Sequence, residues 1–123
     1  GNGGGATTKE GWLEENEALV SAYSRDLVAA LNTINMGERT ATVASCNQVS
    51  DTAREVRQEA LPAPNAEVNT HLTKAVDLGI QAAESCLAGA RETQAHAIEE
   101  AQRLFADARK AMDDAEAAID DWV

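Results

Sequence analysis

Hydrophobic and polar residues alternate with a helical period along most of the chain. In the first stretch, the apolar residues form one stripe along a helix: Leu13, Leu19, Val20, Tyr23, Leu27, Ala30, Leu31 and Ile34. This spacing predicts an amphipathic helix. Thr7 and Glu10 have the three-residue separation of a capping box, so we expect Thr7 to cap this helix. Gly37 is expected to close it in the left-handed conformation.

The same pattern predicts a second helix from Glu38 and a third helix that Asn65 caps. The apolar positions of the second helix are Val43, Cys46, Val49, Ala53, Val56 and Ala60, and those of the third are Val68, Leu72, Val76, Ile80, Ala83, Cys86, Leu87 and Ala90. Pro62 and Pro64 separate the two helices, because they remove two amide donors and push the preceding residues out of the α region. A tight connection is therefore predicted at Pro62–Pro64.

The boundary before the last helix carries the weakest signal. One helix from Asn65 to Trp122 would hold about 57 residues and measure ~85 Å at 1.5 Å per residue, leaving the apolar residues of its second half without a partner in the chain. We place a break at Gly89 to Thr93, with Thr93 as a cap; the alternative is a continuous helix that pairs in a dimer. The expected fold is all-α, an antiparallel up-down-up-down four-helix bundle over residues 8–123.

Composition narrows the classes of partner. Of the 123 residues 44% are hydrophobic, but 25 of these are alanines and only four are aromatic, so the core must be thin and the helices close together. Lysine and arginine number 10 against 21 aspartates and glutamates, a net charge of −11. That field repels phosphate backbones, which makes nucleic acid an unsuitable partner. No apolar run reaches the ~18–20 residues that span a bilayer.

Residues 1–7 are rich in glycine and are expected to form a flexible tether. A bacterial lipoprotein trimmed just after its lipidated cysteine would begin in this way, and a membrane anchor would then be an N-terminal lipid rather than a transmembrane helix. The alternatives are a protein cut from a longer precursor and a remnant of cloning.

Two cysteines, Cys46 and Cys86, fall on apolar stripes at roughly matching heights of the second and third helices. In an oxidising compartment they would be expected to form a disulfide. The alternative is a pair of buried free thiols in a cytosolic protein. A catalytic or metal-binding thiol is disfavoured, because the chain has no Cys-x-x-Cys and neither cysteine has a histidine near it in sequence.

Three segments support a resemblance: Ser45-Cys46, Leu61-Pro62-Ala63-Pro64, and Cys86-Leu87-Ala88-Gly89 ahead of an alanine-rich last helix. Over residues 43–120 they resemble the extracytoplasmic helical domains of uncharacterised actinobacterial envelope proteins, many of them predicted lipoproteins. The resemblance implies a bundle with a Cys46–Cys86 disulfide outside the cytoplasmic membrane. It implies no activity and assigns no role to other residues.

Sites for chemistry are sparse in the sequence. About 19 helical residues separate the levels of His71 and His96 by ~28 Å, so the two cannot share a metal within one chain. Glu92, His96 and Glu100 share one helical face, but a solvated polar face with ordinary i, i+4 interactions is the favoured interpretation. Adjacent carboxylates such as Asp113-Asp114 point about 100° apart on a helix and do not form one acid-base site. No enzyme activity, cofactor or metal is expected.

One end of the predicted bundle is the candidate docking site. Trp12, Pro62, Pro64 and Trp122 all fall there, beside the tether, and could meet a partner or lipid headgroups. Alternatively, the tryptophans only cap the alanine-rich core. We therefore predict a non-enzymatic binding or scaffolding domain of the cell envelope, with its partner and oligomeric state unassigned. The alternative is a small-ligand-sensing bundle that uses Tyr23, Asn47 and Gln48.

Overall fold

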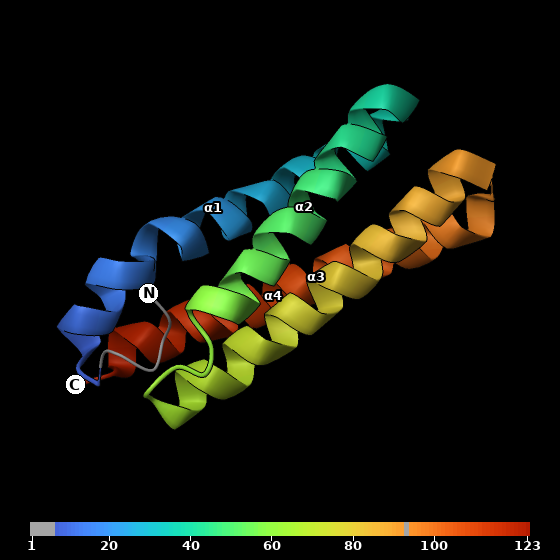
Figure 1. Cartoon of the computed structure of the whole chain (residues 1–123). Coiled ribbons are helices and arrows are strands. Elements are labelled where there is room, and N and C mark those ends of the chain that lie inside the picture. The colour runs from blue at the N-terminus through green and yellow to red at the C-terminus, as the bar shows by residue number, and fades with distance from the viewer. Residues whose placement is uncertain (1–6, 93) are drawn as a thin grey trace.

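The computed structural model describes residues 7–92 and 94–123. This part of the chain contains four helices and no strand: α1 (Lys9–Met36), α2 (Arg39–Glu59), α3 (Ala66–Glu92) and α4 (Ala95–Asp121). Figure 1 shows them side by side, with α1 leading away from one end of the molecule and α2 leading back toward it. The predicted all-α class and the four helices are confirmed.

Both ends of α1 are set by local hydrogen bonds. Thr8, not Thr7, is the N-cap, since its hydroxyl accepts from the Gly11 amide at 3.1 Å. The prediction of Thr7 was wrong by one residue, because two adjacent threonines offer the same capping group and the sequence alone does not distinguish them. Gly37 closes the helix at φ 75°, as predicted.

The connection between α2 and α3 also follows the prediction. The last helical residue of α2 is Glu59, with Ala60 as its C-cap. The Asn65 side chain accepts from the Val68 amide at 3.0 Å and so caps α3. Cap residues that satisfy amides at the start of a helix typically contribute about 1 kcal/mol.

The last connection lies where a break was predicted. Because α3 ends at Glu92 and α4 begins at Ala95, the alternative of one continuous helix is wrong. The predicted cap Thr93 lies outside the described residues. Gln94 occupies the N-cap position of α4 and makes no side-chain cap bond there.

Hydrogen bonds join the early residues of α1, α2 and α4 to the end of a neighbouring helix. The Thr42 hydroxyl in the first turn of α2 donates to the Thr33 carbonyl near the end of α1. The Trp12 indole Nε1 in the first turn of α1 donates to the carbonyl of Ala60, at the end of α2. Gln102, early in α4, donates to the Asn35 side chain at the end of α1.

The core is built largely from small side chains. Among the described residues, 28 hydrophobic residues are buried and 13 of these are alanines. Five alanines on one face of α4 are buried: Ala101, Ala108, Ala111, Ala115 and Ala118. The most closely packed pair of helices is α3 and α4. In contrast, α1 and α4 make the fewest contacts of the four neighbouring pairs. The seam between α1 and α4 is therefore the loosest in the bundle.

Candidate functional site

The two tryptophans predicted to mark a docking site lie together, with ring centroids 5.9 Å apart and planes tilted by 56°. Trp12 is fully buried, and its Nε1 donates to Ala60 at 3.1 Å. Trp122 is only partly buried and packs against the core from outside. Trp12 is thus a core residue, and Trp122 supplies the aromatic surface.

The proline turn adjoins this pair. Pro62 and Pro64 are exposed on either side of the buried Ala63. The Ala63 amide donates to the Asn69 side chain at 2.9 Å, which fixes the turn to the start of α3. This end of the bundle is formed by the first turn of α1, the Pro62–Pro64 turn and the last turn of α4. We call it the terminal end. The structure therefore brings all four predicted docking residues to one end.

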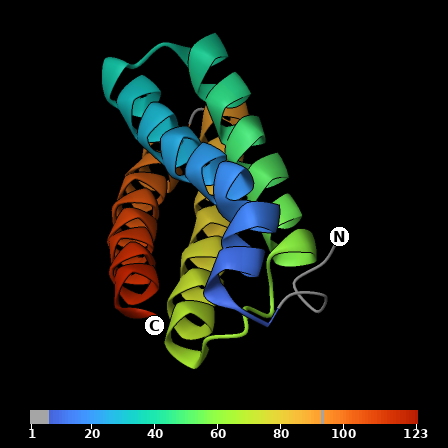
Figure 2. The same cartoon turned by 90° about the vertical axis from the view of Figure 1, so that its left-hand side faces the viewer.

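A hollow opens at the terminal end, between the N-terminal part of α1 and the C-terminal part of α4. Figure 2 shows these two parts at the same end of the molecule. Its volume is about 240 Å³. We call it the α1–α4 groove, and its lining residues are Trp12, Leu13, Glu17, Val20, Ser21, Glu116, Ile119 and Asp120. The groove combines apolar side chains with three carboxylates.

The cysteines form a disulfide between α2 and α3, with Cα atoms 6.4 Å apart. Both residues are fully buried. The predicted pairing of Cys46 with Cys86 is confirmed, and the alternative of two free thiols is wrong. The bridge joins the α1–α2 pair of helices to the α3–α4 pair.

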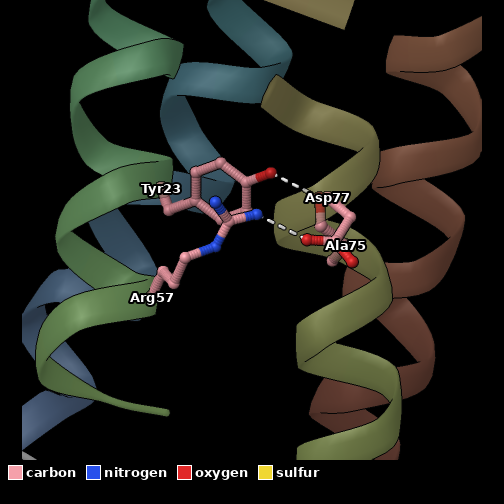
Figure 3. Close-up of polar contacts among 4 residues, drawn as sticks. All are labelled: Tyr23, Arg57, Ala75 and Asp77. Atoms are coloured by element: carbon pink, nitrogen blue, oxygen red, sulfur yellow. Dashed lines mark hydrogen bonds and ion pairs between the residues drawn. The ribbon is translucent and has the colours of Figure 1, made fainter. Parts of the chain in front are cut away.

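The buried side chain of Tyr23 makes a polar contact between α1 and α3 (Figure 3). Its hydroxyl donates to the Ala75 carbonyl on α3 at 2.6 Å. Nearby, Arg57 on α2 forms an ion pair of 2.6 Å with Asp77, where both side chains are half-exposed. The Tyr23 hydroxyl is thus engaged by the backbone, while Asn47 and Gln48 are exposed on α2. These three residues of the ligand-sensing alternative do not converge on one cavity.

The environment of Tyr23 changes its acidity. Burial, and then the nearby Asp77 carboxylate, raise the pKa of the Tyr23 phenol well above its usual range. Both effects disfavour the phenolate, since a buried charge loses hydration and a second negative charge repels it.

This shift predicts a loss of stability in alkali. The folded state holds the phenolic proton more tightly than the unfolded state. The stabilising effect of the protonated phenol is therefore complete below pH ~10. As the pH rises beyond this value, the free energy of unfolding falls by up to about 1.4 kcal/mol per pH unit. Denaturant unfolding of wild type and Tyr23→Phe at several pH values will measure it, and the Phe variant should lose less stability. Tyr23 is the chain's one tyrosine, so tyrosinate absorbance reports it directly. A phenol that titrates at its ordinary pKa in the folded chain would contradict this expectation.

The residues weighed as metal ligands lie apart. His71 is in the second turn of α3, whereas His96 is in the first turn of α4 at the opposite end. Among residues 7–92 and 94–123, no group of three histidine, cysteine or acidic side chains is placed to hold a metal ion. In the same part of the chain, none of the helices combines the length and the apolar character that crossing a bilayer requires.

Sequence reasoning missed the carboxylates of the groove. Glu116 and Asp120 are four residues apart, and Leu13, Glu17 and Val20 follow one another at helical spacing, so each set shares a face. That spacing alone shows which residues of one helix are neighbours. It does not show that the two faces meet.

Comparison with known proteins adds no relative. The chain matches no protein-family model, no curated protein and no solved structure. The resemblance to actinobacterial envelope domains therefore stays a prediction.

Proposed function

We propose that this chain is a non-enzymatic binding or scaffolding domain of the bacterial cell envelope, folded as an antiparallel up-down-up-down bundle. Its terminal end docks a protein or another envelope component, and nucleic acid is not a partner. An N-terminal lipid holds the domain at the membrane. Such a tether would present the terminal end close to the membrane surface.

The observation that carries the proposal is the gathering of docking features at the terminal end. The side chain of Trp122 packs against the core but stays partly exposed, and tryptophan is enriched at protein interfaces. Pro62 and Pro64 are exposed on a turn that the Ala63–Asn69 hydrogen bond holds in place. A preorganised surface binds at a smaller cost in conformational entropy than a mobile one.

The disulfide supports the location. Disulfides persist mainly in oxidising compartments such as the periplasm and the extracellular space. The Cys46–Cys86 bridge is buried between two helices, where it acts as a structural link. An extracytoplasmic domain with a thin, alanine-rich core gains stability from such a bridge.

Site-specific photo-cross-linking tests the proposal. A photoreactive amino acid at position 64 should cross-link a discrete partner in envelope extract of the bacterium that encodes the chain. The matched control carries the same group at Met36, which is 79% exposed at the opposite end. We expect the cross-link at position 64 and none at position 36. Equal cross-linking at both positions, or none at position 64, would count against a docking role of the terminal end.

A further inference from the structure

The α1–α4 groove has an apolar floor and an acidic rim. Leu13 and Val20 from α1 and Ile119 from α4 supply aliphatic surface, and the fully buried Trp12 also lines the groove. Its volume of about 240 Å³ lies below the roughly 300–1,000 Å³ of pockets that enclose drug-sized ligands. A groove of this size suits one long side chain of another protein.

The charge of the rim restricts which side chain this is. Glu17, Glu116 and Asp120 all line the groove, and within the part of the chain that the structure describes none of them forms an ion pair. Two basic residues of α4 are already paired along their own helix, Arg103 with Glu100 and Lys110 with Asp114. Three unpaired carboxylates around one hollow, on a chain of net charge −11, create a negative potential that attracts a cation.

A guanidinium group on an aliphatic stem meets both demands. The methylene groups of arginine can lie along apolar surface while the charged head stays at the rim. Its planar head donates to more than one carboxylate oxygen at once. Lysine shares the stem but presents a compact, strongly hydrated charge.

We infer that the α1–α4 groove binds an arginine side chain that a partner protein presents, with its stem on Leu13, Val20 and Ile119 and its guanidinium among Glu17, Glu116 and Asp120. This inference rests on the proposed docking function and names the chemistry of the partner. A basic partner surface would also be steered toward the acidic domain by long-range attraction.

The test is a titration of the isotope-labelled chain, followed by backbone amide NMR, with acetyl-arginine amide as the probe. We expect saturable shifts at residues 13–21 and 116–120, with a dissociation constant on the order of 1–10 mM. Acetyl-norleucine amide has an apolar stem without the charge and should shift these residues much less. The cavity at the opposite end is an internal comparison, because its one charged lining residue is Arg39, which should repel the probe.

Matched variants separate local from general electrostatics. Glu17→Gln with Glu116→Gln should weaken arginine binding at least about fivefold, since two rim charges are lost. Glu84→Gln with Glu99→Gln removes the same net charge at exposed positions outside the groove and should change binding less than about twofold. Ser21→Phe, which fills the groove from an exposed lining position, should abolish the shifts.

Equal weakening by both pairs of charge variants, or probe shifts spread over the whole surface, would overturn the inference. This failure can be told apart from failure of the proposed function. If position 64 cross-links a partner but the probe ignores the groove, docking stands and the arginine site does not. Saturable shifts confined to the groove, lost in Ser21→Phe, support the arginine site.

Discussion

Replacing both Cys46 and Cys86 with alanine is expected to lower the free energy of unfolding by about 3.5–4 kcal/mol, which is the chain-entropy value for a closed loop of this length. The two cysteines are 40 residues apart, so the disulfide removes much freedom from the unfolded chain. A thin core makes this contribution a large share of the whole, since domains are typically stable by only 5–15 kcal/mol. Urea unfolding of the oxidised wild type and of the double variant will measure the difference.

A reductant provides the control. Reduction should destabilise the wild type to nearly the level of the double variant and should leave the variant unchanged. The double variant also loses two buried sulfur atoms, so the reduced wild type isolates the effect of the covalent link. A variant within about 1 kcal/mol of oxidised wild type would show that the bridge does not constrain the unfolded chain as expected.

Gly79→Ala should destabilise the fold by about 2–3 kcal/mol, although alanine normally favours a helix by about 1 kcal/mol over glycine. A Cβ atom at position 79 would lie 1.9 Å from the Tyr23 hydroxyl oxygen. In a helix the carbonyl of residue 75 points toward residue 79, so only a glycine lets the phenol reach the Ala75 oxygen. The added methyl group would displace the ring and break the Tyr23–Ala75 hydrogen bond.

A double-mutant cycle with Tyr23→Phe tests this explanation. Without the hydroxyl, the nearest atom to the new Cβ is the ring carbon Cζ at 3.0 Å, so most of the clash is gone. The double variant should therefore be more stable than the sum of the single changes by about 1–2 kcal/mol. Additive effects, or stabilisation by Gly79→Ala alone, would show that Tyr23 does not pack against this glycine. Denaturant unfolding of the four proteins gives the coupling free energy.

Much of the fold was predictable because local chemistry sets the helix ends. Gly37 needs a positive φ, Asn65 offers a side-chain cap, and Pro62 with Pro64 cannot continue a helix. The predictions erred where two neighbours offer the same chemistry or where packing decides. One example is Thr8 in place of Thr7. Another is Thr42, buried because its hydroxyl bonds to carbonyls of Thr33 and Glu38, whereas the predicted stripe residue Val43 is only partly buried.

The candidate site was predictable only in outline. Helix order and length place Trp12 and Trp122 at one end, and the structure brings their rings together. The groove depends on the distance between α1 and α4, which follows from tertiary packing of small residues on α4 against α3. Gly79 could be read from sequence only as a weak helix breaker, because its role depends on a tyrosine 56 residues away in the chain.

The disulfide also determines how the domain would respond to mechanical load. Because Trp12 and Trp122 lie together, force that pulls the two ends of the chain apart would peel α1 and α4 away from their neighbours, one turn after another. Peeling would stop at the sulfur atoms, and tension would pass directly from Cys46 to Cys86. The intervening segment would carry no tension, and the 40-residue separation shortens the maximum extension by about 130–145 Å, at 3.3–3.6 Å per residue.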